Sequence, residues 1–144
     1  MRLVIQRVKF AKLSVDNQVV SEIGCGLLVL CGVVKGDTTE QVKRAANKIA
    51  TIRIFEENEK MNKSIQDVGG EVLLVSNFTL CTVNTSGARP DFGFSADKQT
   101  ALELYNQVYN ELTALGIKTK LGVFGADMQI QTQLDGPITI YKEI

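Results

Sequence analysis

The chain has 144 residues, of which 44% are hydrophobic and 22% are charged, the ordinary balance of a soluble globular domain. Its 16 basic and 16 acidic residues cancel to a formal net charge of zero, which argues against a protein that grips a long nucleic-acid duplex through its phosphates. The chain contains no histidine, and this excludes serine–histidine and cysteine–histidine catalysis together with histidine-ligated metal sites.

Length and hydropathy together predict one domain spanning residues 1–144. No apolar run approaches the length of a membrane span, and the first residues lack the apolar core of a signal peptide. We therefore expect a cytoplasmic protein without membrane contact. Cysteines stand at positions 25, 31 and 81, an odd number without a Cys-x-x-Cys pair. This pattern predicts small core residues and neither a disulfide framework nor a zinc site, and we expect no metal or cofactor.

The chain is predicted to begin with strands. Residues 3–8 form the first, and residues 13–20 form a tight hairpin whose two-residue turn is Asp16-Asn17. Residues 26–34 (GLLVLCGVV) are a continuous apolar run, typical of a strand that is buried on both faces. Gly36-Asp37 then turns the chain.

A helix is predicted to follow this turn. Thr38 and Gln41 have the spacing of a capping box, with Thr38 as the N-cap, and one apolar helical face follows at Val42, Ala45, Ala46 and Ile49. Residues 52–55 are expected to be extended. Residues 56–70 are polar and are expected to form a loop or a short irregular segment. Residues 71–75 form a strand that delivers residues 76–80 at its end.

The C-terminal half is predicted to contain a loop, a helix and three strands. Residues 84–94 carry Gly and Pro and form the loop, and Ser95 is the expected N-cap of the helix. The helix presents an apolar stripe and ends at Gly116; the stripe consists of Ala101, Tyr105, Val108, Leu112 and Leu115. Strands follow over residues 117–124, 128–134 and 138–142.

Strands therefore outnumber helices, and several are neighbours in sequence without a helix between them. This order favours an α+β fold in which mostly antiparallel sheets curl into a barrel-like core, with two main helices packed on it.

Three segments carry groups suited to chemistry. Residues 76–80 (SNFTL) offer hydroxyl groups and exposed backbone N–H groups at a strand end, although they also suit an ordinary strand end. Gly136-Pro137 is a turn signal, and a turn before the last strand is the simpler interpretation. Residues 87–92 place Arg89 and Phe92 in a loop, where they suit a phosphate or a base; a salt bridge in the loop is the alternative.

These segments, in this order, resemble the D-aminoacyl-tRNA deacylase family from end to end. The matching stretches are LVIQRV at 3–8, GLLVLCGV at 26–33, SNFTL at 76–80, ARPDF at 88–92, GVFGADMQIQ at 122–131 and DGPITI at 135–140. The family's active-site pattern is Ser-Gln-Phe-Thr-Leu, and its second signature is Asn-x-Gly-Pro-x-Thr. Asn77 stands in place of the usual Gln, and Leu134 in place of the usual Asn.

The resemblance implies an enzyme that hydrolyses the ester between a D-amino acid, or glycine, and the 3′ end of tRNA. It implies a homodimer in which the Gly136-Pro137 pair, held cis, enters the partner's pocket and excludes L-amino acids sterically. Arg7 stands where the family has an arginine that fixes this geometry. Met128 and Phe124 are expected beside the substrate.

The residues also limit the mechanism. Thr79 is the obvious hydroxyl nucleophile, but a threonine is weak without a base. The resemblance instead implies help from the substrate's own 2′-OH, with Ser76 and Asn77 beside the reacting ester, and we favour the backbone N–H groups of Phe78 and Thr79 as oxyanion donors. Two other functions stay open: a related deacylase that holds Gly-Pro trans and accepts an L-amino acid, and a non-catalytic nucleic-acid-binding protein.

Overall fold

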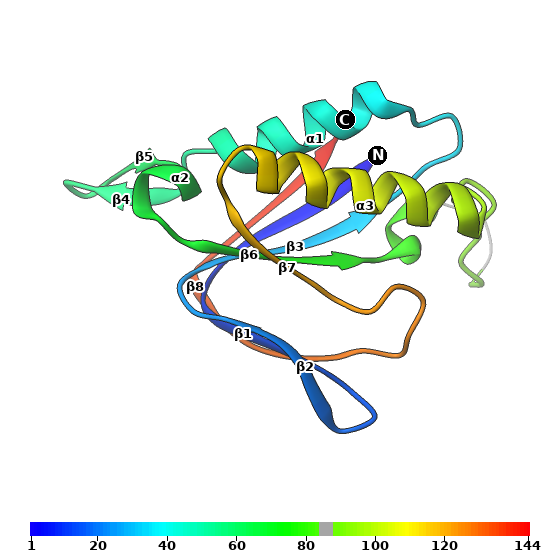
Figure 1. Cartoon of the computed structure of the whole chain (residues 1–144), viewed down its shortest axis with the longest axis horizontal. Helices are drawn as coiled ribbons and strands as arrows, with labels where there is room; N and C mark the ends of the chain where they lie inside the picture. Colours follow the sequence, from blue (N-terminus) through cyan, green and yellow to red (C-terminus); the bar gives the residue numbers. More distant parts are fainter. Residues whose placement is uncertain (84–87) are drawn as a thin grey trace.

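The computed structural model describes residues 1–83 and 88–144 of the chain. Its main sheet is built from β1 (Arg2–Val15), β2 (Gln18–Ile23), β3 (Gly26–Gly32), β6 (Glu71–Ser76), β7 (Lys118–Leu121) and β8 (Gln129–Glu143). In the described residues these form a six-stranded sheet with the order β2-β1-β3-β6-β7, and β8 pairs with β1. Helices α1 (Thr39–Thr51) and α3 (Lys98–Ala114) lie on one face of the sheet, which curls away from them (Figure 1).

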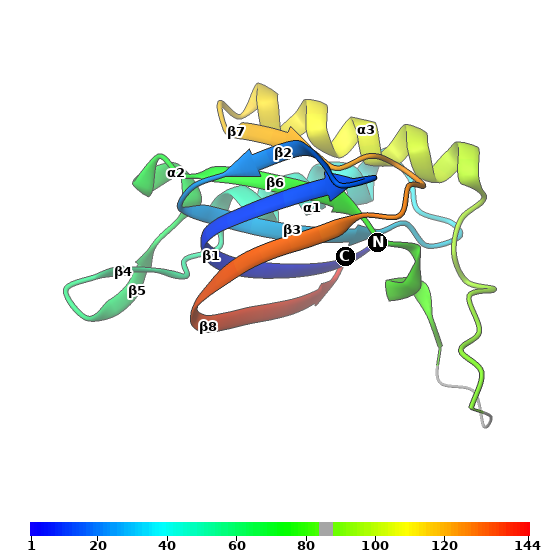
Figure 2. The same cartoon turned by 90° about the horizontal axis from the view of Figure 1, so that it is seen from below.

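Strand β1 is the central element of the sheet. One of its edges pairs with β3 and then with β2, and the other edge pairs with β8, all antiparallel. Figure 2 shows β8 running alongside β1. The predicted hairpin is confirmed, because β1 ends at Val15, β2 begins at Gln18, and the turn residues Asp16 and Asn17 have φ angles of 49° and 61°. Such left-handed angles belong to the tight turns that suit the twist of a two-stranded hairpin.

The two main helices connect parallel strands. β3 and β6 are parallel, as are β6 and β7, so α1 and α3 each lie within a crossover. The capping box predicted for α1 is present at Thr38 and Gln41. The expected N-cap Ser95 is wrong for α3: Asp97 is the N-cap and accepts a hydrogen bond from the Thr100 N–H at 3.0 Å. A carboxylate at this position also complements the positive end of the helix dipole.

The segment expected to be irregular, residues 56–70, has regular structure. It contains the hairpin of β4 (Phe55–Glu57) and β5 (Lys60–Lys63), followed by the short helix α2 (Ile65–Val68). The hairpin turns at Asn58 and Glu59, whose φ angles are 52° and 64°. Periodicity did not predict these elements because their strands are short and exposed, with only Phe55 buried among β4 and β5 residues.

The last two predicted strands are a single strand, β8, which continues through Gly136-Pro137. Its pairing with β1 shows how this is possible: Gln6 faces Thr139 and Val8 faces Leu134. Residues 135–138 therefore lie opposite Arg7 alone and form a bulge. The predicted turn is thus a bulge inside a continuous strand.

The expected α+β fold with a barrel-like sheet and two main helices is confirmed. One group of buried side chains lies between the helices and the sheet, including Leu3, Val29, Ile49, Leu74 and Tyr105. A second lies within the curl of the sheet, including Val8, Leu13, Ile23 and Val75. In the described part of the chain, helices long and apolar enough to cross a membrane are absent.

Candidate active site

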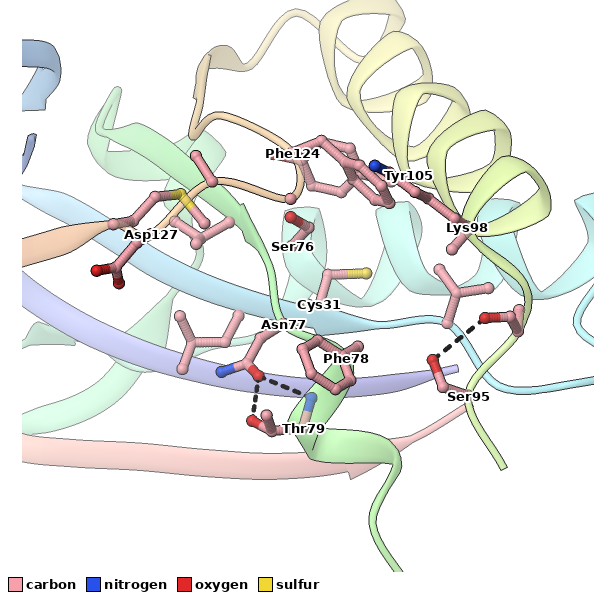
Figure 3. A pocket seen from close by; sticks show the side chains of 18 of the residues that line it. Cys31, Ser76, Asn77, Phe78, Thr79, Ser95, Lys98, Tyr105, Phe124 and Asp127 are labelled. Carbon is pink, nitrogen blue, oxygen red and sulfur yellow. Dashed lines mark hydrogen bonds between the residues drawn. The ribbon is translucent and has the colours of Figure 1, made fainter. Parts of the chain in front are cut away.

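A cavity of about 740 Å³ opens where β3 and β6 end. Its walls come from Ser76–Thr79, from the first turns of α3 and from the segment that joins β7 to β8 (Figure 3). Much of the lining is apolar, with Val33 and Val75 at the strand ends and Ile130 on β8. A pocket of this size and character suits a small organic group held by a few polar contacts.

The end of β6 is fastened to β3 at the cavity. Cys31 and Ser76 are partners in the parallel ladder, and the Asn77 N–H donates to the Cys31 carbonyl at 2.8 Å. The chain then enters a single 3₁₀ turn, η1 (Phe78–Cys81), for which Asn77 is the N-cap. The strand end predicted from the sequence is thus a strand followed by a tight turn, and this turn exposes backbone donors.

Thr79 is held by the side chain of Asn77. Asn77 Oδ1 accepts a hydrogen bond from the Thr79 N–H at 3.1 Å and a second one from the Thr79 hydroxyl (Figure 3). Both Thr79 donors are therefore occupied within the chain. The structure does not present Thr79 as a free oxyanion donor, which limits the role that the sequence suggested for its N–H group.

Phe78 differs from Thr79 in this respect. Its backbone N–H has no acceptor among the described residues, and it stands at the first position of η1, where a helix leaves its N–H groups unsatisfied. Phe78 is 59% exposed as a residue, and its ring meets the ring of Phe92 edge-on, with centroids 5.1 Å apart. The aromatic side chain therefore shields the rim of the cavity, while the N–H group remains available.

The thiols beside the cavity are poor nucleophiles. Burial raises the pKa of Cys31 from 9.0 to about 12. Burial also raises the pKa of Cys81, whose thiol donates to the Val33 carbonyl at 3.3 Å. Because the thiolate is the reactive form, both cysteines are inert at neutral pH. The prediction that these two cysteines are core residues is confirmed, whereas Cys25 is exposed.

Met128 and Phe124, expected beside the substrate, both line the cavity. The Phe124 ring lies 5.8 Å from the ring of Tyr105, whose hydroxyl donates to the Leu74 carbonyl at 2.7 Å. Burial raises the pKa of this phenol, so Tyr105 stays neutral. The rings of Phe124 and Tyr105 form an apolar wall opposite Asn77 and Thr79 (Figure 3).

Gly136, Pro137 and Arg7 do not line the cavity of their own chain. Gly136 and Pro137 are exposed, and the peptide bond between them is cis, as expected. Arg7 is only 5% exposed and lies beneath their bulge. It donates to the Ile54 carbonyl at 2.7 Å, and its Nε lies 2.9 Å from Oδ2 of Asp135, an ion pair without the alignment of a hydrogen bond.

Several residues that line the cavity were not assigned to the site from the sequence, notably Lys98, Tyr105 and Ser95 in or before α3. Tyr105 was assigned to the apolar stripe, which is correct but incomplete, since its ring also faces the cavity (Figure 3). Lys98 had no signal in the sequence, because a lysine in the first turn of a helix is ordinarily a solvated side chain. Residues 84–87 of the predicted loop lie outside the described residues.

Comparison with known proteins identifies a family to which this chain is similar over nearly its full length. Residues 4–143 match the family model described as D-Tyr-tRNA(Tyr) deacylase. A protein of Desulfitobacterium hafniense (strain Y51) named D-aminoacyl-tRNA deacylase is 47% identical over 97% of this chain and 95% of its own length. One of Fusobacterium nucleatum with the same name is 48% identical over 97% of this chain and 93% of its own.

Solved structures agree in fold. A structure named c-Myc DNA Unwinding Element Binding Protein is 36% identical, with a TM-score of 0.94 over 100% of this chain and 99% of its own. A second, described as a probable eukaryotic D-amino acid tRNA deacylase, is 19% identical, with a TM-score of 0.85 over 99% of this chain and 98% of its own. At that identity, the second match supports the fold alone.

Proposed function

Since this chain belongs to the D-Tyr-tRNA(Tyr) deacylase family, we propose that its cavity at Ser76–Thr79 takes the aminoacylated 3′ end of tRNA and hydrolyses the ester there. The chain is a D-aminoacyl-tRNA deacylase, an ester hydrolase. The reaction is proposed to take place at this cavity, beside Ser76–Thr79, and residues 1–144 are proposed to form one catalytic domain. The cytoplasm, where aminoacyl-tRNA is used, is the proposed compartment.

The observation that carries the assignment is the unoccupied N–H of Phe78 at the cavity. Ester hydrolysis places negative charge on the former carbonyl oxygen, and a fixed N–H donor stabilises that charge without reorganising. In other hydrolases, removing one such donor lowers kcat by about 10²–10³. The capped turn at Asn77 fixes the direction of this N–H group, since the next N–H and the Thr79 hydroxyl are both bound to Asn77.

The described side chains at the cavity provide no activated nucleophile and no general base beside the ester. The chain has no histidine, the Cys31 thiol is neutral, and the Thr79 hydroxyl donates to Asn77. Asp127 lines the cavity, but Figure 3 shows its carboxylate directed away from Ser76 and Phe124. We therefore propose that water attacks the ester with help from the substrate's own 2′-OH, and that the protein contributes position and the Phe78 donor.

The Gly136-Pro137 bulge is proposed to act on a second subunit. It is exposed and absent from the lining of its own cavity, so any action on a cavity requires another copy. A homodimer with twofold symmetry places each bulge at the partner's site. Rigid backbone atoms there would block one direction from the substrate's Cα, so that a D-amino acid or glycine fits and an L-amino acid clashes.

The direct test is to incubate the protein with D-Tyr-tRNA, Gly-tRNA and L-Tyr-tRNA and to follow the ester. We expect rapid loss of the first two esters and slow loss of the third. Equal rates for D-Tyr-tRNA and L-Tyr-tRNA would contradict chiral selection, and rapid loss of L-Tyr-tRNA alone would indicate the L-accepting relative. Binding of all three without cleavage would favour a nucleic-acid-binding protein.

The shared site is tested by pairing two different variants in one dimer. Ala126→Trp fills the cavity and should abolish hydrolysis. Gly136→Ala places a Cβ 2.9 Å from the Ile138 side chain at a φ of +118°, which distorts the bulge and should allow L-Tyr-tRNA to be cleaved. In a purified mixed dimer, the intact cavity faces the intact bulge of the other subunit, so rejection of L-Tyr-tRNA should return. If each bulge serves its own subunit, the mixed dimer should cleave L-Tyr-tRNA as Gly136→Ala does.

A further inference from the structure

Lys98 is placed at the cavity by the first turn of α3. Figure 3 shows its side chain extending from that helix toward Phe124, on the opposite side of the cavity from Asn77 and Thr79. Its end reaches the segment between β7 and β8: a Cβ built on Gly125 would lie 3.8 Å from Lys98 Cε and 4.0 Å from Nζ. Lys98 therefore spans the rim of the cavity between two elements.

The ammonium group of Lys98 has no partner within the described part of the chain. It takes part in none of the ion pairs there, and no side-chain acceptor holds it. The neighbouring carboxylate of Asp97 accepts from the Thr100 N–H, and the carboxylate of Asp127 points away from the cavity (Figure 3). Lys98 is the cation among the described residues that line this cavity.

An aminoacylated nucleotide presents few charges to such a group. The ester, the ribose and the base are neutral, and the α-amino group of the amino acid is cationic and would be repelled. The phosphate on the 5′ side of the terminal nucleotide is the anion that remains. A lysine binds phosphate as a flexible point charge, so this contact requires no fixed geometry.

We propose that Lys98 binds the 5′ phosphate of the terminal nucleotide of aminoacyl-tRNA. The proposal rests on the proposed function and adds a substrate contact and a direction of binding. The phosphate lies at Lys98, and the aminoacyl ester lies across the cavity at Phe78. In a chain with zero net charge, this local cation supplies attraction that the protein as a whole does not.

Binding measurements test the contact without relying on hydrolysis. The probes are adenosine and adenosine 5′-(methyl phosphate), titrated into the full chain and followed by NMR. The wild type should bind the phosphate-bearing probe about tenfold more tightly, and Lys98→Gln should remove this preference while leaving adenosine binding unchanged. Lys98→Arg should retain most of the preference for the phosphate-bearing probe. Lys118→Gln is the matched control, because Lys118 is also exposed but lies on β7, away from the cavity lining.

Kinetics with D-Tyr-tRNA supply a second measurement. Lys98→Gln should raise KM about tenfold with little change in kcat, since the phosphate is bound equally before and during reaction, and should make KM less sensitive to salt. Equal binding of the two probes by the wild type, or equal weakening of both by Lys98→Gln, would overturn the proposal. Absence of hydrolysis with phosphate preference intact would refute the proposed function and leave the phosphate site standing.

Discussion

Arg7 Nε lies 2.9 Å from Asp135 Oδ2, so a buried guanidinium on β1 holds the residue at which the β8 bulge begins. The same guanidinium donates to the Ile54 carbonyl and lies 3.5 Å from the exposed carboxylate of Glu56. Arg7 thus ties β1, the bulge and the segment before β4 together. This explains how a residue outside the cavity can serve the site: it fixes the element that is proposed to enter the partner.

Replacing Arg7 with Met should destabilise the protein by about 3 kcal/mol, because the substitution removes the ion-pair partner of Asp135 and the hydrogen-bond donor to the Ile54 carbonyl. Urea unfolding should show a lower midpoint with an unchanged slope. Glu56→Gln is the control, since its carboxylate is 64% exposed and should matter little. A midpoint for Arg7→Met within error of the wild type would show that the ion pair contributes nothing to the bulge.

Thr79→Ala should lower kcat by less than about tenfold, whereas loss of a required nucleophile costs about a thousandfold or more. The alanine keeps the backbone N–H that donates to Asn77, and it loses only a hydroxyl that is already bound to Asn77. Single-turnover deacylation of D-Tyr-tRNA gives the rate. Mass spectrometry of acid-quenched wild-type enzyme should show no added acyl group; an ester on Thr79 would make it the nucleophile after all.

Gly26→Ala should destabilise the fold by at least about 2 kcal/mol. A Cβ on Gly26 would lie 1.9 Å from the carbonyl oxygen of Glu71, so β3 and β6 would have to separate where their parallel pairing begins. Gly24→Ala is the matched control, because nothing lies within 4 Å of its Cβ position. Urea denaturation of both variants compares them directly, and equal midpoints would mean that the strands adjust without cost.

Thiol alkylation at pH 8 should modify Cys25 alone in the folded protein, since Cys31 and Cys81 are buried with raised pKa values. Only the unfolded chain should expose all three thiols. The pKa of Cys31 is raised from 9.0 to about 12 in the folded protein. Between these two values the folded state keeps the thiol proton while the unfolded state releases it, so the free energy of unfolding depends on pH there.

The contribution of the Cys31 thiol to the free energy of unfolding is therefore present below pH 9 and is lost as the pH rises toward 12. The urea midpoint should fall over that range, and less steeply in Cys31→Ala. Alkylation of Cys31 in the native protein at pH 8 would show that its thiol is neither buried nor protonated as described.

The sequence by itself determined the elements whose signals are local. The capping box at Thr38 and Gln41 and the Asp16-Asn17 hairpin depend on residues within a few positions of one another, and both are present. The apolar run from Gly26 likewise predicted a strand buried on both faces. Order and spacing of the motifs were enough to identify the family, because motifs that are weak singly are specific together.

Only the tertiary structure decided the relations between distant residues. The bulge at residues 135–138 appears as a turn in the sequence, and the pairing of β8 with β1 makes it part of one strand. The occupation of both Thr79 donors by Asn77 depends on how η1 folds. Lys98 joins the cavity because α3 begins beside the segment between β7 and β8. Such contacts arise from packing between segments far apart in the chain, and no local pattern records them.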